Sequence, residues 1–325
     1  MRILFTGKNA FQGLKALDNA SLGSTALSAK HALVRDIRDQ PDLVICVDWE
    51  MTAKSLLKDA RSQGIPTVLI MNEPCVVIPA HADSKVLALF DRIIRVGRPP
   101  SAGGLPWPQT WRLEPNRGSR ANKAVIVNAD KWSFIGGQLY WLRAAIAGRN
   151  SDIDVYGPGW DRATYARFAH RIFDLGRTIV NGRLPSSRGL RYLLTRVKAH
   201  KGTTVDKIHT MAEYKIAIVI ENSDELMTEK LFDAFFAGCI PVYVGPPVGK
   251  FGIPEELVIQ APPNIQGLNA GISRALEMNS KEYSSLLTRF LHARTTRETW
   301  ASGSAFKAIL ESALDCSAFE SVPES

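Results

Sequence analysis

The chain has 325 residues, and its 40 lysines and arginines outnumber its 32 aspartates and glutamates, which gives a net charge of +8. Hydrophobic residues make up 45% and charged residues 22%, which excludes a disordered chain and, at this length, favours two globular domains. No apolar run reaches the ~20 residues of a membrane-spanning helix. The opening residues, MRILFTG, resemble a strand rather than a charged leader peptide, so a cytoplasmic protein is expected.

Strand and helix alternate through the first half of the chain, which predicts an α/β domain with an open parallel sheet and helices on both faces. Strands are expected at 3–5, 42–47, 67–71 and 92–96, and helices at 26–38 and 52–62. Residues 99–115 are rich in Pro, Gly and Trp and predict irregular structure. We therefore place the first domain at 1–115.

The same alternation begins again near Lys123 and predicts a second Rossmann-like domain at 116–305, followed by a C-terminal helix and tail at 306–325. Strands are expected at 124–127, 153–156, 215–220 and 240–244, with a short one near 259. Helices are expected at 139–147, 162–175, 190–197, 228–237, 282–291 and 305–313.

The stretch YKIAIVIENSDELMTEKLFDAFFAGCIPVYVG, residues 214–245, divides into a buried strand, a polar loop, a helix and a second strand. Such βαβ units bind ligands outside the carboxyl ends of their strands. The side chains expected at this edge are Glu221, Asn222, Ser223, Thr228, Glu229 and Lys230, joined by Asn128 and Lys131 after the strand at 124–127. The hydroxyl of Thr228 is expected to cap the helix.

These residue types suit a nucleoside diphosphate. A carboxylate can accept hydrogen bonds from both hydroxyls of a ribose, and an ammonium group beside a helix N-terminus suits a diphosphate. A Thr-Glu-Lys helix start is by itself ordinary capping chemistry. The hypothesis therefore depends on the whole run of residues 214–245.

The ordered run of ENS, TEKLFDAFFAG and IPVYVG resembles the donor-binding signature of family 10 fucosyltransferases, the α-1,3/1,4-fucosyltransferases, and the resemblance covers the second half of the chain. It implies the GT-B fold, in which two Rossmann-like domains face a cleft. It also implies an inverting, metal-independent transfer of fucose from GDP-fucose to a glycan hydroxyl, without a further cofactor. On this resemblance, Glu229 holds the ribose, and Lys230 with the helix N-terminus neutralises the leaving diphosphate. Glu221 and Asn222 would line the sugar pocket.

Glu73 is the candidate catalytic base. It follows the strand expected at 67–71 in the order Asn-Glu-Pro, where the family carries a similar Glu-Ser-Pro or Glu-Pro-Pro. An inverting transfer needs a group that takes the proton of the acceptor hydroxyl as its oxygen attacks the anomeric carbon. Weaker candidates for this role in the same half are Asp48, Glu50 and His81.

The chain departs from the family pattern at two positions that contact the donor in that family. The family arginine that contacts the donor diphosphate aligns with Gly137, and the tyrosine before TEKL is replaced by Leu226. Lys131 and Arg143 are the candidates to replace that arginine. These departures keep open an alternative, a transferase that uses another nucleotide sugar, and a second one, a nucleotide- or glycan-binding protein without turnover.

Basic residues are concentrated in 162–207, which holds eleven lysines and arginines. A solvated basic face, a nucleic-acid contact, an anionic sugar nucleotide and an acceptor on an anionic membrane surface all fit this charge. No nucleic-acid fold signature accompanies it, so nucleic acid is not expected. The expected partners are a nucleotide sugar and an oligosaccharide or glycolipid acceptor, with peripheral contact to an anionic membrane as an option.

Overall fold

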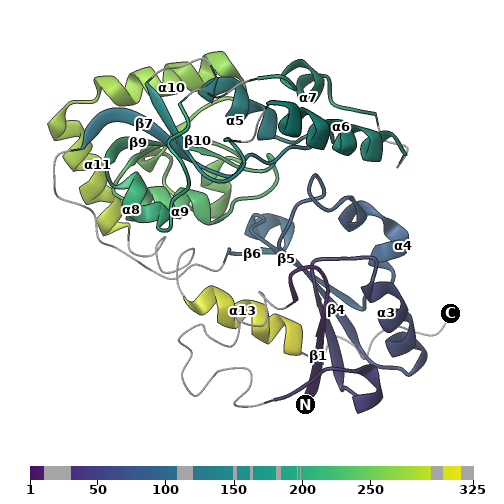
Figure 1. Ribbon diagram of the computed structural model, residues 1–325. Coiled ribbons are helices and arrows are strands. Elements are labelled where there is room, and N and C mark those ends of the chain that lie inside the picture. The colour runs from purple at the N-terminus through teal and green to yellow at the C-terminus, as the bar shows by residue number, and fades with distance from the viewer. Residues whose placement is uncertain are drawn as a thin grey trace. The chain divides into compact units, whose positions relative to one another are not determined.

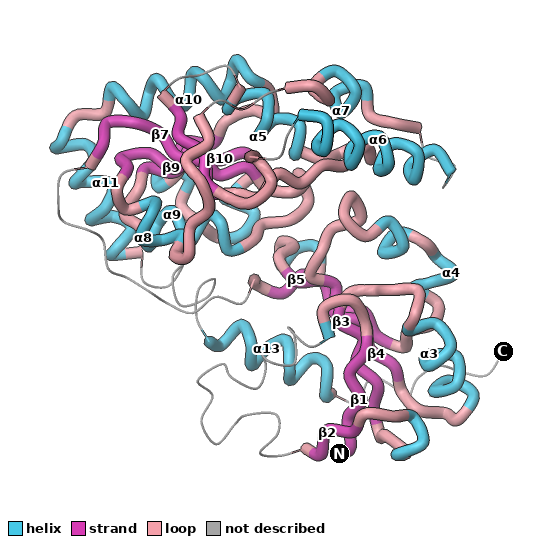
Figure 2. The backbone as a smooth tube through the Cα atoms, in the orientation of Figure 1, coloured by secondary structure: helices cyan, strands magenta, loops and turns pink. Residues whose placement is uncertain are grey.

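The computed structural model describes residues 1–10, 31–107, 120–148, 152–161, 164–180, 184–195, 197, 199–293 and 303–315. The chain divides into two compact units, one formed by Met1–Trp111 with Arg297–Ser325 and the other by Arg112–Thr296. Each unit contains a parallel sheet and its own helices (Figures 1 and 2).

The first unit is built on a six-stranded sheet in the order β2-β1-β3-β4-β5-β6, in which every neighbouring pair is parallel. Its strands are β1 (Arg2–Thr6), β2 (Ala32–Val34), β3 (Leu43–Val47), β4 (Thr67–Met71), β5 (Arg92–Val96) and β6 (Gly104–Leu105). Every residue of β3 and β4 is buried, as expected of central strands covered on both faces. The strands expected at 3–5, 42–47, 67–71 and 92–96 are thus confirmed.

Two helices cover opposite faces of this sheet. Alternate residues of β3 point to opposite sides, so Ile45 packs with Ile309 of α13 (Gly303–Leu314), whereas Cys46 packs with Leu57 of α3 (Ala53–Ser62). The helix expected at 305–313 therefore belongs to the core of the first unit, which lies more than 200 residues earlier in the chain (Figure 1).

Two predictions fail in the first unit. The helix expected at 26–38 is wrong over its described residues, because Ala32–Val34 pairs with β1 as an edge strand and Ile37–Asp39 forms a single 3₁₀ turn. Pairing with a neighbouring strand overrides the weak helical pattern of this segment. Residues 99–115 are not wholly irregular, since Gly104–Leu105 extends the sheet beside β5; residues 108–119 lie outside the described part.

The second unit holds a five-stranded parallel sheet in the order β11-β10-β9-β7-β8. Its strands are β7 (Ala121–Val127), β8 (Ile153–Tyr156), β9 (Tyr214–Ile220), β10 (Ile240–Val244) and β11 (Ile259–Gln260). Each lies where the sequence predicts it, and one continuous apolar core joins the sheet to its helices.

The helices described in the second unit are α5 (Tyr140–Ala147), α6 (Thr164–Val180), α7 (Ser187–Arg191), α8 (Lys207–Met211), α9 (Glu229–Phe236), α10 (Ile265–Glu277) and α11 (Ser280–His292). The helix expected at 190–197 is wrong beyond Arg191, because Tyr192 turns inward and stacks on Trp141 with 5.2 Å between ring centroids. No helix in the described part of the chain has the length and apolar character needed to cross a bilayer.

Helix α10 was not predicted, and its two glycines explain why. A glycine inside a helical pattern normally weakens the case for a helix. Here Gly271 lets α10 approach β10 closely, since a Cβ at this position would stand 2.9 Å from Cγ1 of Val242. The glycine therefore marks close packing rather than a break in the helix.

Candidate functional site

A buried aspartate ties together the carboxyl ends of three strands in the first unit. Asp48 follows β3 in the left-handed region, with φ 55°, and is fully buried. Its Oδ1 accepts hydrogen bonds from the backbone N–H groups of Asn72 (2.8 Å) and Glu73 (3.0 Å), which follow β4. Its Oδ2 accepts from the side-chain amide of Asn9 (2.6 Å), which follows β1. Asp48 thereby fixes the backbone that carries Glu73.

Gly7 allows the loop after β1 to reach this point. The N–H of Lys8 donates to the backbone oxygen of Asp48 at 2.8 Å, and Gly7 itself has φ 99°. A Cβ on Gly7 would stand 2.5 Å from that oxygen, closer than any side chain can be accommodated. The glycine after the first strand is therefore required by a close backbone contact.

His81 holds Glu73 from the other side. Its Nδ1 lies 2.9 Å from the carbonyl oxygen of Glu73, and its Nε2 lies 3.1 Å from the N–H of Trp49. The Trp49 N–H can only donate, so Nε2 accepts, the proton sits on Nδ1 and the ring is neutral. Burial lowers the pKa of His81, against the opposing effects of the Glu73 carbonyl and the Asp48 carboxylate. Both ring nitrogens of His81 are thus engaged in hydrogen bonds, one to the backbone of Glu73 and one to that of Trp49.

The neutral His81 predicts acid sensitivity. An unfolded chain binds a proton at this histidine near pH 6.5, whereas the folded chain does not, so the free energy of unfolding falls as the pH drops below about 6.5. The expected slope is about 1.4 kcal/mol per pH unit until the folded-state pKa is reached. Urea unfolding between pH 8 and pH 5 measures it. His81→Gln should flatten this part of the profile, while His292→Gln at an exposed helix end should leave it unchanged; identical profiles for all three proteins would contradict the assignment.

In the second unit, a buried carboxylate organises the start of α9. Glu221 follows β9 and is fully buried; its Oε1 accepts from the N–H of Thr228 at 2.9 Å and its Oε2 from the Thr228 hydroxyl at 2.7 Å. The ammonium group of Lys230 lies 3.3 Å from Oε2 of Glu221 and 2.7 Å from Oγ1 of Thr228. The expected side-chain cap is therefore wrong: the Thr228 hydroxyl donates to Glu221 and accepts no hydrogen bond from the backbone N–H groups of its own helix.

The residues packed behind Glu221 leave no space for a side chain on Gly245. A Cβ on Gly245, which follows β10, would overlap the hydroxyl of Tyr243 and stand 2.8 Å from Cγ of Glu221. Burial, together with the nearby charge of Glu221, raises the pKa of Tyr243 well above its usual value, so the phenol stays neutral. Glu221 is thus enclosed, and its contribution at this edge is to hold Thr228 and Lys230.

Arg143 makes buried hydrogen bonds within the second unit. Its Nε and Nη2 donate to the carbonyl oxygen of Ile220 at 3.1 and 2.6 Å, and Nη2 also donates to Oδ1 of Asn222 at 3.0 Å. The backbone oxygen of Asn222 accepts from the N–H of Leu139 at 3.1 Å. Arg143 therefore joins α5 to the end of β9 and orients Asn222. Of the two candidates to replace the family arginine, only Lys131 is exposed.

Glu229 lies at the partly exposed start of α9, in contact with a lysine that the sequence analysis did not single out. Lys207 of α8 places its Nζ 3.4 Å from Oε1 of Glu229 and 2.8 Å from Oδ2 of Asp233. Burial acts to raise the pKa of Glu229, but the positive charges of Lys230 and Lys207 outweigh it and hold this pKa below its usual value. Burial acts to lower the pKa of Lys207, and Glu229 and Asp233 raise it instead. Both groups are charged at neutral pH.

Six of the predicted donor-site residues thus lie at the carboxyl edge of β9 and the start of α9, namely Glu221, Asn222, Ser223, Thr228, Glu229 and Lys230, whereas Asn128 and Lys131 follow β7. Ser223 is buried beside them, and its hydroxyl accepts from the N–H of Glu225 at 3.3 Å. Asn128 follows the neighbouring strand β7, where its N–H donates to Tyr156 at 2.9 Å. Glu73 lies at the matching edge of the first unit's sheet.

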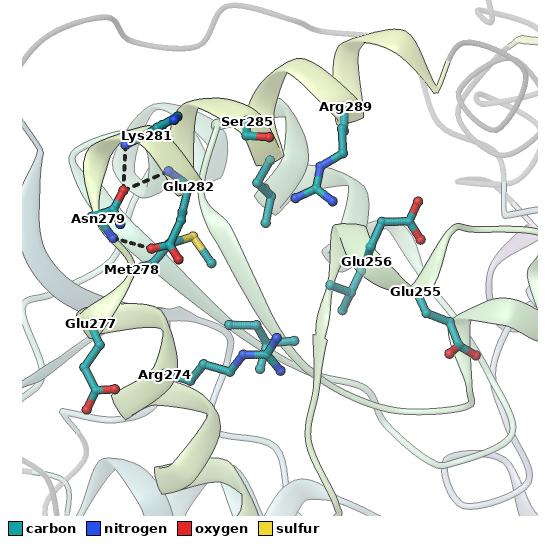
Figure 3. Close-up of a pocket in the computed structure, with 13 residues that line it drawn as sticks. Glu255, Glu256, Arg274, Glu277, Met278, Asn279, Lys281, Glu282, Ser285 and Arg289 are labelled. Atoms are coloured by element: carbon teal, nitrogen blue, oxygen red, sulfur yellow. Dashed lines mark hydrogen bonds between the residues drawn. The ribbon is translucent and has the colours of Figure 1, made fainter.

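A separate pocket of about 980 Å³ lies between α10, α11 and residues 255–259 (Figure 3). Arg274 and Arg289 line it together with Glu255 and Glu256. None of the predicted site residues contributes to its walls, so it is distinct from the edge that carries Glu229 and Lys230.

No protein-family model matches the chain. A segment of 45 residues, 13% of the chain, is 44% identical to a fucosyltransferase-like protein of Arabidopsis thaliana, of which it covers 9%.

Solved structures align over nearly the whole chain at low identity. An α1,3-fucosyltransferase matches with a TM-score of 0.57 and 13% identity over 100% of this chain and 93% of that one. HepE of Anabaena, in complex with UDP and glucose, matches with a TM-score of 0.56 and 12% identity over 96% and 98% of the two chains. A glycosyltransferase of Rickettsia africae matches with a TM-score of 0.55 and 10% identity over 99% of both. With its two parallel sheets, the chain has the GT-B fold of glycosyltransferases.

Proposed function

We propose that the chain is a glycosyltransferase that moves a sugar from a nucleotide-sugar donor to a hydroxyl of a glycan acceptor. The observation that carries this proposal is the charged start of α9, where Lys230 is held by the buried Glu221 and Thr228 beside an ionised Glu229. Similar folds crystallised with UDP, UDP-glucose, GDP and GDP-fucose support the donor class.

The donor would bind at the N-terminal end of α9. The ammonium group of Lys230 and the N-terminal end of the helix favour the negative charge of a diphosphate, and more so as that diphosphate becomes the leaving group. The carboxylate of Glu229 can accept hydrogen bonds from two ribose hydroxyls. Lys207, which pairs with Glu229 in the protein alone, would remain close to the bound nucleotide and add positive charge.

The acceptor would be activated by Glu73. Its carboxylate takes the proton of the acceptor hydroxyl, the oxygen forms a bond to the anomeric carbon, and the bond from that carbon to the phosphate oxygen breaks. A single displacement of this kind inverts the anomeric configuration. Lys230 and the helix N-terminus stabilise the departing charge, so the proposed mechanism is metal-independent and needs no further cofactor.

Fucose is the sugar we propose, with GDP-fucose as the donor, on the resemblance of residues 214–245 to family 10 fucosyltransferases. Gly137 and Leu226, at positions where that family has arginine and tyrosine, favour as the alternative another nucleotide sugar on the same scaffold. Thermal-shift measurements with GDP, GDP-fucose, UDP and UDP-glucose separate the two. We expect stabilisation by GDP and GDP-fucose; a shift with the uridine nucleotides alone would reject fucose and keep the transferase.

Lys230→Met should weaken donor binding by about 10- to 100-fold, the equivalent of roughly 1.5–3 kcal/mol for a charged hydrogen bond to phosphate. Isothermal titration with the nucleotide diphosphate measures the change. Lys281→Met, an exposed lysine of α11, serves as the matched control and should bind as the unaltered protein does.

Removal of Lys230 also leaves Glu221 with fewer partners, so stability must be separated from binding. In the double variant E221Q/K230M, the glutamine amide can hydrogen bond to Thr228 without a buried charge, and the free energy of unfolding should recover. Donor affinity should stay low. Recovery of both stability and affinity would place the diphosphate elsewhere.

A further inference from the structure

Helix α6 is attached to the second unit through a buried arginine and the partly buried Leu175 rather than through a broad apolar stripe. The guanidinium group of Arg171 is buried, where Nη2 donates to Oδ1 of Asp130 at 3.0 Å and Nη1 donates to the carbonyl oxygen of Leu193. The same group lies over the ring of Trp132, 3.8 Å from its centroid. The inward face of the helix therefore carries a charge that is fully compensated by its neighbours.

The outward face of α6 is apolar. Its large exposed side chains are Phe168, Ile172, Phe173, Ile179 and Val180, and the most exposed are Phe173 at 71% and Val180 at 87%. At 100° per residue these positions span an arc of roughly 140°. By sequence, the other helix positions within that arc are Tyr165, Ala169 and Gly176, so the arc contains no charged residue. A surface helix normally has the opposite arrangement, with its apolar face against the core.

The neighbouring segment extends this face. Helix α7 lies beside α6 (Figure 1), and Arg171 of α6 donates a hydrogen bond to Leu193, two residues after the end of α7. Leu184, Leu190 and Leu194 are exposed there, to 94% in the case of Leu184. Eight of the eleven large exposed hydrophobic residues in the described chain fall between 168 and 194. We call these eight the α6–α7 surface. An exposed apolar patch of this kind marks a site that contacts a partner protein or a membrane.

The charge near the α6–α7 surface indicates which kind of partner it contacts. Apart from Arg171, which is compensated internally, and Lys207, which pairs with Glu229, residues 162–207 hold nine lysines and arginines against only Asp174 and Asp206. Exposed Arg188 and Arg191 lie within α7 itself. An apolar helix face in a basic segment suits the interface of an anionic bilayer, where apolar side chains enter the acyl boundary and arginines meet the headgroups. A nucleic acid would contact the basic side chains but would leave the apolar arc of α6 exposed to water.

We propose that the α6–α7 surface binds the surface of an anionic lipid bilayer. This proposal does not depend on the sugar that the protein transfers. It is tested by flotation of the full chain with vesicles of phosphatidylcholine alone and of phosphatidylcholine with phosphatidylglycerol, at low and at physiological salt. Binding to the anionic vesicles, weaker at higher salt and lost on neutral vesicles, is expected.

The triple variant F173S/I179S/V180S keeps every basic residue and should bind anionic vesicles at least tenfold more weakly. Its matched control is M51S/V205S, which removes two exposed hydrophobic residues outside this surface and should bind normally. Circular dichroism and donor binding confirm that both variants are folded. Equal binding by the triple variant would mean that charge alone is responsible and would overturn the proposal, as would the absence of vesicle binding at low salt. So would a dimer that the triple variant converts to a monomer without any vesicle binding, since a second copy would then cover the face.

Discussion

Glu73→Gln should lower kcat by about 100- to 10,000-fold while the dissociation constant of the donor changes by less than about twofold. Glutamine keeps the size of the side chain but cannot take a proton from the acceptor hydroxyl. The backbone of Glu73 donates to Asp48 and accepts from His81, and neither hydrogen bond involves the carboxylate, so both remain. The loss therefore falls on chemistry rather than on folding. Steady-state rates of nucleotide release with and without acceptor, together with calorimetric donor binding, measure the two effects.

The matched control is Glu50→Gln, which changes the other partly buried glutamate near this edge of the sheet. It should retain most of the activity. If Glu50→Gln instead abolishes transfer and Glu73→Gln does not, Glu50 is the base. If neither variant loses activity, the proton acceptor is not on this edge.

Asp48→Ala should lower the free energy of unfolding of the first unit by about 3–5 kcal/mol. The substitution leaves the N–H groups of Asn72 and Glu73 and the amide of Asn9 without their buried acceptor. Alanine also tolerates the left-handed backbone at φ 55° less well than aspartate does. Urea unfolding measures the loss, and hydrogen exchange of residues 43–81 locates it.

Asp48→Asn is the variant to compare with Asp48→Ala. An asparagine oxygen can accept from Asn72 and Glu73, and asparagine is also at ease in the left-handed region, so the loss should stay near 1 kcal/mol. Equal losses for the two variants would mean that the charge of Asp48, rather than its hydrogen-bond geometry, holds these strand ends together.

The fold could be predicted because its strands are continuous apolar runs. Residues 67–71, 92–96 and 240–244 lie inside their sheets and form strands with the expected bounds, since inner parallel strands are covered on both faces and leave an unambiguous pattern. The edge strand Ala32–Val34 lacks such a run, and it was predicted as a helix. The edge strand Ile153–Tyr156 was predicted correctly, and its burial explains why: three of its four residues are buried, whereas none of Ala32–Val34 is.

The candidate site could be predicted only in part. Polar residues after buried strands identified Glu73, Glu221 and Glu229, because parallel strands present their carboxyl ends at one edge. Their partners were not predictable in the same way. Lys207 reaches Glu229 from 22 residues earlier in the chain, and Arg143 reaches Ile220 from 77 residues earlier. Pairs so far apart leave no local pattern in a single sequence.

The position of α13 has a practical consequence for anyone who dissects this protein. Since Ile309, Leu310 and Ala313 complete the same apolar layer as Ile45 and Ile94, a fragment that stops after the second unit would leave one side of the first sheet open to water. Such a fragment would be expected to aggregate. The first unit can be produced by itself only by splicing its N-terminal stretch to the distant C-terminal helix, whereas the second unit is a single uninterrupted piece.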